Sequence, residues 1–199
     1  MLAFAPSRPA HADAEFSAFL ESLWPDAAAL GVSRATFDDA LDGLTPDRSL
    51  PDLAKPDGTP ELKKGQAEFI KSPAAYINER QIQTLAGAGR AKAKAFAAEL
   101  DGIEARYHVD RSIILAIWGR ETNYGGYDLP HNALRVIATQ AFLGTRKDYF
   151  RNELLWALKI IEDGHVTKAG MKSSWAGAMG LTQFMPTNFR DFAVDFDGD

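Results

Sequence analysis

The sequence predicts a mainly α-helical protein, and three observations lead to that class. Apolar residues recur at spacings of three and four along much of the chain, convincing strand alternation is scarce, and several periodic runs begin or end at a capping residue, a glycine or a proline. A chain of 199 residues can bury a substantial core, and it fits one domain or two small ones.

The first part of the chain should contain two short helices and a connector. Four apolar residues at helical spacing define the first helix: Phe16, Phe19, Leu20 and Leu23. It should stop at Trp24 and Pro25, and Ser33 should cap a second helix that ends before Gly43. Residues 45–61 contain four prolines and little periodicity, so we expect an extended connector there.

The middle of the chain should be helical. Ser72 and Pro73 indicate a helix start, because proline is favoured at the first helical position. The alanine-rich run at 79–106 should form a helix as well, although Gly87 and Gly89 weaken its early part.

The last part of the chain should hold another helix at roughly 147–163 that ends at Gly164. Its apolar side is formed by Phe150, Leu154, Leu158 and Ile161. Further on, Pro186 should end one short element and Thr187 should cap the next.

Glu121 occupies a position where the pattern of a buried helix calls for another apolar residue. The residues that share this face, at i, i+3, i+4 and i+7, are Ile114, Ile117, Trp118 and Glu121. Asp110 should cap this helix and Gly125-Gly126 should end it. Partial burial and the negative end of the helix dipole should raise the pKa of Glu121, which suits a proton donor. The alternative is a structural glutamate that pairs with Arg120 or turns to solvent.

A second stretch, SSWAGAMGLTQFMPTNF at 173–189, has the character of a ligand-binding loop. Gly177 and Gly180 permit tight turns and a close approach of backbone to ligand, and Gln183 is a polar residue within an apolar run. A tight connection between two helices explains this stretch almost as well.

Composition excludes several classes of function. The formal net charge of −5 gives no electrostatic reason to bind nucleic acid or anionic membrane. The lack of cysteine excludes disulfides, thiolate metal sites, cysteine nucleophiles and a lipid-modified N-terminal cysteine. Residues 1–12 end in Ala10-His11-Ala12, which resembles a processing site, so they are either a signal-peptide remnant or a disordered tail. No run is long enough to span a bilayer.

The segment GRETNYG, followed by SSWAGAMGLTQFMPTNF and then AVDFDGD, closely resembles the lytic murein transglycosylase B family. The likeness extends upstream through AEFIKSPAAYINERQI and IEARYHVDRSIILAIWG, and it covers roughly residues 65–199. It implies a lysozyme-like catalytic core at 106–199, preceded by an N-terminal helical region at 13–105. Because relatives continue further, we expect the core to be incomplete at its C-terminal end.

The resemblance also implies an activity and a set of site residues. Glu121 would be the single acid/base of an enzyme that cleaves the MurNAc-GlcNAc β-1,4 bond of peptidoglycan and forms 1,6-anhydro-MurNAc. The residues expected to contact substrate are Ser174, Gln183, Phe184, Tyr149, Arg146 and, on a looser match, Tyr76. Core packing is the alternative for Tyr149 and Phe184. Arg120 departs from the family, which more often has an apolar residue there.

No cofactor is required for this chemistry, but the acidic end of the chain suggests a metal. Asp195, Asp197 and Asp199 stand at i, i+2 and i+4, like the first three ligands of an EF-hand loop. Some members of the resembled family bind calcium here, which implies a structural calcium in the full-length protein. This chain alone should bind calcium weakly or not at all. A solvated acidic turn is the alternative.

Two other functions stay open at this point. A lysozyme-type hydrolase would need a second carboxylate, whereas Asp128, Asp148 and Glu153 have the character of solvated or capping charges. A non-catalytic peptidoglycan-binding module would keep the cleft aromatics and dispense with Glu121. The expected partner is the peptidoglycan glycan strand, the expected location is the periplasm, and any partner in the cell-wall machinery is unidentified.

Overall fold

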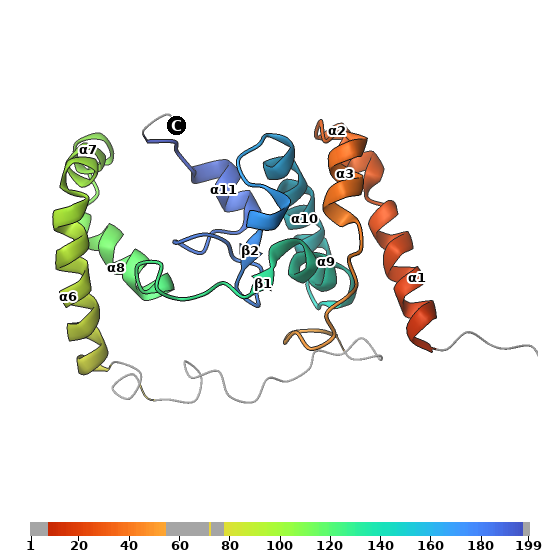
Figure 1. Cartoon of the computed structure of the whole chain (residues 1–199), viewed down its shortest axis with the longest axis horizontal. Coiled ribbons are helices and arrows are strands. Elements are labelled where there is room, and N and C mark those ends of the chain that lie inside the picture. Colours follow the sequence, from red (N-terminus) through yellow and green to blue (C-terminus); the bar gives the residue numbers. More distant parts are fainter. Residues whose placement is uncertain (1–7, 55–71, 73–77, 197–199) are drawn as a thin grey trace, which may run out of the picture. The chain divides into compact units, whose positions relative to one another are not determined.

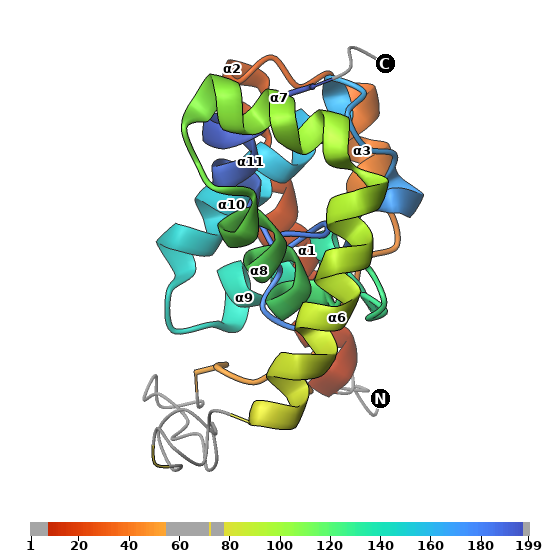
Figure 2. The same ribbon diagram turned by 90° about the vertical axis from the view of Figure 1, so that its left-hand side faces the viewer.

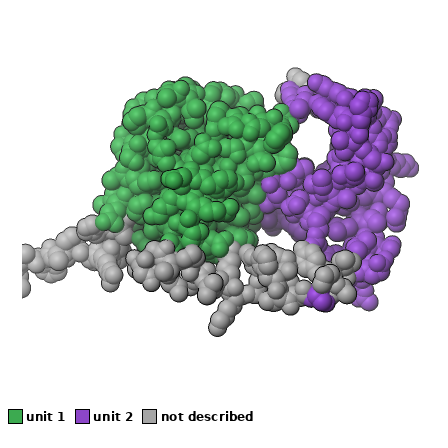
Figure 3. Space-filling model, turned by 180° about the vertical axis from the view of Figure 1, so that it is seen from behind, with its two compact units in different colours: residues 1–62, 130–179, 184–193 green, residues 63–129, 180–183, 194–199 purple. Residues whose placement is uncertain are grey.

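The structure, a computed structural model, describes residues 8–54, Ser72 and residues 78–196 (Figure 1). Its chain divides into two compact units, which Figure 3 colours separately. Unit 1 consists of the described residues within Met1–Leu62, Pro130–Met179 and Phe184–Ala193. Unit 2 consists of the described residues within Lys63–Leu129, Gly180–Gln183 and Val194–Asp199. In the part of the chain that is described, no helix has the length and apolar character needed to cross a membrane.

Unit 1 is a group of helices around one apolar core. Its elements are α1 (Arg8–Glu21), α2 (Trp24–Ala29), α3 (Arg34–Leu41), α9 (Ala133–Leu143), α10 (Lys147–Glu162), the 3-10 turn η1 (Lys168–Gly170) and α11 (Pro186–Phe192). Two short strands, β1 (His131–Asn132) and β2 (Lys172–Ser173), pair antiparallel with His131 opposite Ser173. Helices α9 and α10 lie side by side (Figure 1), and Leu134, Ile137, Leu154 and Leu158 are fully buried there.

Local signals predicted several of these helices correctly. Ser33 caps α3 by accepting a hydrogen bond from the backbone N–H of Thr36 at 3.2 Å. The predicted helix at 147–163 is confirmed as α10, and Gly164 follows its end with a positive φ of 78°. Helix α1 begins at Arg8, within the segment 1–12, and residues 1–7 lie outside the described residues.

Helix α9 was not expected, although it lies at the centre of unit 1. Asn132 caps it by accepting a hydrogen bond from the backbone N–H of Arg135 at 2.9 Å. Nearly every position from Ala133 to Ala141 is buried, so the segment lacks the amphipathic period that reveals a surface helix.

The described part of the expected connector, residues 45–54, runs along α9 without forming a helix. The Gln140 amide donates a hydrogen bond to the Pro51 carbonyl at 2.9 Å, and the Ala54 N–H donates to the Leu143 carbonyl at 2.7 Å. Residues 48–52 form turns and a bend, so the described part is an irregular connector and not a fully extended one. The remaining residues of the connector, and the helix start expected at Pro73, lie outside the described residues.

Unit 2 contains α6 (Glu79–Ala95), α7 (Ala97–Tyr107) and α8 (Arg111–Thr122) (Figure 2). The prediction of one helix at 79–106 is wrong in one respect, because the backbone leaves the helical conformation at Phe96, with φ −114° and ψ 36°. Gly87 and Gly89, which were expected to weaken the helix, do not interrupt it, because both lie within α6. Asp110 caps α8 as predicted, and its carboxylate accepts from the Ser112 N–H at 2.7 Å.

Tyr124 packs between helices α6 and α8, and its ring lies against a glycine on each helix. A methyl group at Gly89 would lie 2.5 Å from the Tyr124 hydroxyl, and one at Gly119 would lie 2.6 Å from it. The same hydroxyl donates a hydrogen bond to the Leu85 carbonyl at 3.1 Å. Glycine is therefore needed at both positions for the close approach of the two helices.

Candidate active site

Glu121 lies in the last turn of α8, as the sequence predicts, but its side chain is exposed. The expected buried stripe is also wrong, since Ile117 on that stripe is 49% exposed. The buried face of α8 is the adjacent one, formed by Leu115, Gly119 and Thr122. Apolar residues occupy every position from 113 to 118, so periodicity alone could not choose between neighbouring faces.

The end of α8 is an unusual left-handed turn that begins two residues after Glu121. The helix ends before the expected Gly125-Gly126, because Asn123 already has a φ of 51° and Tyr124 has a φ of 57°. Gly125 continues in the same region at 83°. A bulky residue such as tyrosine rarely adopts a positive φ, and such strained backbone tends to occur at functional sites. Here the turn is what inserts the Tyr124 ring between its two glycines.

Thr122 fixes this helix end to the turn at Gly180–Gln183. Its side chain is 1% exposed, and its hydroxyl donates a hydrogen bond to the Leu181 carbonyl at 2.8 Å. The same oxygen accepts from the Gly125 N–H at 3.2 Å. Gln183, with a φ of 57°, closes the turn by donating from its amide to the Gly180 carbonyl at 3.1 Å. Unit 2 therefore brings together the helix end that carries Glu121 and the turn that carries Gln183.

Ser174 and Phe184 lie in unit 1, on a small hairpin before α11. Phe184 and Met179 exchange two backbone hydrogen bonds of 2.9 and 2.7 Å, and the Ser174 N–H donates to the Ala178 carbonyl at 2.9 Å. Gly177 has a φ of 90°, and a methyl group there would lie 2.8 Å from Ile137. This glycine thus serves backbone conformation and close packing, and Ser174 and Phe184 are half-buried.

Arg146 and Tyr149 lie together at the start of α10. The guanidinium carbon of Arg146 is 5.1 Å from the centre of the Tyr149 ring, and Tyr149 is 41% exposed, so this ring is not an ordinary core residue. Partial burial and the neighbouring carboxylate of Glu153 raise the pKa of the Tyr149 phenol. Tyr76, the looser match, lies outside the described residues.

Thr187 and Glu153 form a contact that the sequence reading missed. Thr187 does not act as a cap, because α11 begins one residue earlier, with Pro186 at its first position. Instead Glu153, which is 1% exposed, accepts from the Thr187 N–H at 2.9 Å and from its hydroxyl at 2.7 Å. Of the two roles expected for Glu153, the capping charge fits this geometry and the solvated charge does not. The burial of Glu153 could have been inferred from the sequence, because Glu153 stands beside Leu154 on the apolar side of α10.

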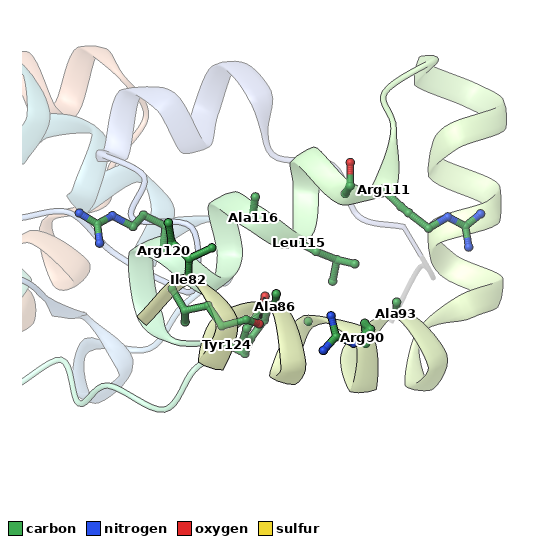
Figure 4. A pocket seen from close by; sticks show the side chains of 12 residues that line it. Ile82, Ala86, Arg90, Ala93, Arg111, Leu115, Ala116, Arg120 and Tyr124 are labelled. Carbon is green, nitrogen blue, oxygen red and sulfur yellow. Dashed lines mark hydrogen bonds between the residues drawn. The ribbon is translucent and has the colours of Figure 1, made fainter. Parts of the chain in front are cut away.

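An apolar pocket of about 570 Å³ lies within unit 2, between α6 and α8 (Figure 4). Ile82, Ala86 and Ala93 of α6 and Leu115 and Ala116 of α8 are among the residues that line it, and Figure 4 shows the Leu115 side chain pointing toward α6. Arg120 lines this pocket, whereas Glu121 does not. The pocket is therefore separate from the residues singled out for catalysis.

The acidic end offers no complete metal site among the described residues. Asp195 is exposed, while Asp197 and Asp199 lie outside the described part of the chain. No group of three or more metal-ligating side chains that could hold an ion occurs among the residues described. The structure therefore does not test the calcium loop.

A family described as the transglycosylase SLT domain matches residues 15–199. The chain is 39% identical to the membrane-bound lytic murein transglycosylase B of Escherichia coli (strain K12) over 94 residues, which are 47% of this chain and 26% of that protein.

Solved structures give a similar result. The chain is similar to SltB3 of Pseudomonas aeruginosa in complex with NAG-NAM-pentapeptide, with a TM-score of 0.75 and 36% identity over 92% of this chain and 47% of that one. The same protein is also known in complex with NAG-anhNAM-pentapeptide. The lytic transglycosylase Slt35 of Escherichia coli, in complex with calcium, aligns with 62% of this chain and 39% of its own, with 32% identity and a TM-score of 0.55. The chain thus spans half or less of the length of these relatives.

Proposed function

Because the chain belongs to the transglycosylase SLT domain family and has the helical, lysozyme-like fold expected of it, we propose that it cleaves peptidoglycan as a lytic transglycosylase. The bond cleaved is the MurNAc-GlcNAc β-1,4 linkage, and the product carries a 1,6-anhydro-MurNAc end. The observation that carries the proposal is the link from Thr122 to the Leu181 carbonyl, because it holds Glu121 and the Gln183 turn in one unit.

Glu121 acts first as an acid and then as a base in this mechanism. Its carboxyl donates a proton to the glycosidic oxygen, the bond from that oxygen to muramoyl C1 breaks, and GlcNAc leaves with a free hydroxyl. The muramoyl C6 hydroxyl then attacks C1 and returns its proton to the Glu121 carboxylate. No water is consumed, so the second carboxylate of an ordinary glycosidase is not needed.

The remaining candidates are assigned to substrate binding. Ser174 hydrogen-bonds the N-acetyl group of the sugar, and Gln183 binds the sugar near the scissile bond. Tyr149, Phe184 and Arg146 contact the glycan or its peptide stem. The exposed Tyr149 ring supports this role, since a large aromatic face open to solvent suits stacking on a sugar ring.

Product analysis on purified peptidoglycan tests the reaction type. We expect glycan ends that carry 1,6-anhydro-MurNAc and no new reducing ends, as measured by mass spectrometry of the released fragments. Reducing MurNAc ends would instead indicate a lysozyme-type hydrolase. Binding without any cleavage would indicate a peptidoglycan-binding module.

Replacement of the acid tests the assignment of Glu121. Glu121→Gln removes the proton donor and should lower kcat at least about a hundredfold, since general acid–base groups contribute about 10²–10⁴-fold. The matched control is Glu99→Gln, which neutralises another exposed glutamate of unit 2 and should leave kcat unchanged. Retained turnover in Glu121→Gln would place the acid at another residue.

Cofactor, location and partner follow from the proposed reaction. Acid–base chemistry on the glycan requires no cofactor, and glycan strands are the partner, which places the protein in the periplasm. A calcium site at Asp195, Asp197 and Asp199 stays a prediction for a longer form of the protein. Titration calorimetry should detect weak or no calcium binding by this chain, and micromolar affinity would contradict that expectation.

A further inference from the structure

Glu153 is a buried carboxylate that lies next to two different parts of unit 1. It lies on α10, and its side chain is 1% exposed. Both carboxylate oxygens are engaged, one by the Thr187 N–H at 2.9 Å and the other by the Thr187 hydroxyl at 2.7 Å. A buried carboxylate without partners is strongly destabilising, so these two donors account for its presence in the apolar interior.

The first of these parts is the start of α11, which Glu153 binds through hydrogen bonds. The first backbone N–H groups of a helix have no partner within the helix, and Met185 at the N-cap position provides no side-chain hydrogen bond. Glu153 reaches across from α10 and supplies the missing acceptor. Helix α11 begins at Pro186, directly after the hairpin in which Phe184 and Met179 are paired. The hydrogen bonds to Thr187 therefore fix the point at which this hairpin rejoins the helical core.

The second part is Tyr149, one turn before Glu153 on the same face of α10. Partial burial and the negative charge of Glu153 raise the pKa of the Tyr149 phenol. The guanidinium carbon of Arg146 lies 5.1 Å from the centre of the same ring. Tyr149 thus has a cation against its ring and a carboxylate one turn further along the helix, and it is still open to solvent.

We propose that Glu153 is a positioning residue for substrate binding, because it holds the start of α11, and with it the Phe184 hairpin, while it lies one turn from Tyr149 on the same face of α10. This inference rests on the proposed function. Glu153 does not touch substrate, so its removal should change affinity for the glycan more than the rate of bond cleavage.

A carboxylate suits this place because both groups that contact it are donors. The Thr187 N–H and the Thr187 hydroxyl each need an acceptor. Glutamine offers one oxygen and an NH₂ group that would face a donor. Glu153→Gln keeps the volume of the side chain but breaks part of this network.

The chain provides a matched control on the same helix. Glu162 also lies on α10 and caps another helix, since its carboxylate accepts from the Ser33 N–H at 3.0 Å and the Ser33 hydroxyl at 2.8 Å. It holds the start of α3 and no candidate substrate residue. Glu162→Gln therefore reproduces the loss of a carboxylate cap without affecting the glycan-binding residues.

The experiment measures KM and kcat on soluble peptidoglycan fragments, and affinity for NAG-NAM-pentapeptide in a Glu121→Gln background. Glu153→Gln should raise KM and Kd about tenfold, the loss expected when a charged hydrogen bond is broken. The change in kcat should stay within about threefold, and Glu162→Gln should leave KM and Kd unchanged. Thr187→Val should weaken binding in the same way as Glu153→Gln, and Thr187→Ser, which keeps the hydroxyl, should restore it.

Ultraviolet titration of the Tyr149 phenol gives a readout that does not depend on turnover, with Tyr149→Phe used to assign the signal. Glu153→Gln should lower the pKa of this phenol, and Glu162→Gln should not. An unchanged KM and Kd in Glu153→Gln and in Thr187→Val, or equal losses in Glu162→Gln, would overturn the inference. If the unsubstituted protein failed to cleave peptidoglycan, the proposed function would be wrong, while the affinity and the titration would still decide the role of Glu153.

Discussion

At the scale of single residues, Tyr124 shows how unit 2 obtains a stable helix pair beside Glu121. Its φ of 57° is unfavourable, yet its ring fills the space left by Gly89 and Gly119, and its hydroxyl reaches the Leu85 carbonyl. Packing and a hydrogen bond thus compensate for backbone strain. The glycines are as important as the tyrosine, because a Cβ atom on either helix would occupy the position of the ring.

Gly119→Ala should therefore destabilise the protein. The added methyl group would lie 2.6 Å from the Tyr124 ring carbon that bears the hydroxyl, far closer than packed atoms allow. Overpacking of this kind typically costs about 1–3 kcal/mol, which chemical denaturation can measure as a loss in the free energy of unfolding.

Gly87→Ala is the matched control for this prediction. Gly87 also lies within a helix of unit 2, but a methyl group there would come no nearer than 3.9 Å to another side chain. Because alanine is the better helix former, the free energy of unfolding should rise by up to about 1 kcal/mol. Equal effects of the two substitutions would show that helix propensity, and not the Tyr124 contact, governs the stability of this pair.

At the scale of elements, Thr122 joins the end of α8 to a turn 59 residues further along the chain. Thr122→Val keeps the shape of the side chain but leaves the Leu181 carbonyl and the Gly125 N–H without their partner. An unsatisfied buried group costs about 1–3 kcal/mol, so the free energy of unfolding should fall by that amount. Because the Gln183 turn would loosen as well, we expect kcat/KM on peptidoglycan to fall.

Thr122→Ser distinguishes the contribution of the hydroxyl from that of the methyl group, because serine lacks only the methyl. Serine keeps both hydrogen bonds, so stability and kcat/KM should be closer to the unsubstituted protein than to Thr122→Val. Serine as harmful as valine would mean that packing of the methyl group matters more than the hydrogen bonds. Both kcat/KM and the free energy of unfolding must be measured, because a purely structural role of Thr122 would change the free energy of unfolding and leave kcat/KM unchanged.

At the scale of the whole molecule, the sequence predicted what is determined locally. Ser33 and Asp110 cap helices whose first N–H groups lie within a few residues of them, and α10 has a clear apolar side. The break at Phe96 and the exposure of Glu121 depend on packing, which no short pattern encodes. The partner of Thr187 is 34 residues away from it. The buried carboxylate on an apolar helix face is Glu153, which was expected to be a solvated or capping charge, and not Glu121.

Carboxylates at helix starts and turns in both units should make the protein sensitive to acid. Hydrogen bonds from Thr36 and Ser33 lower the pKa of Glu162 in unit 1, and those from Arg111 and Ser112 lower the pKa values of Glu104 and Asp110 in unit 2. A carboxylate whose pKa is lower in the folded state stabilises the fold fully above its unfolded pKa. That contribution is lost as the pH falls through the folded value.

The melting temperature should therefore fall progressively once the pH drops below about 4.5, near the unfolded pKa values of aspartate and glutamate. Thermal unfolding followed by circular dichroism between neutral pH and pH 3 measures this fall. Glu162→Gln removes one of the titrating caps, so its melting temperature should be lower at neutral pH and should approach that of the unsubstituted protein in acid. If the two proteins instead differed by the same amount at every pH, the charge of Glu162 would not be the source of its stabilising effect.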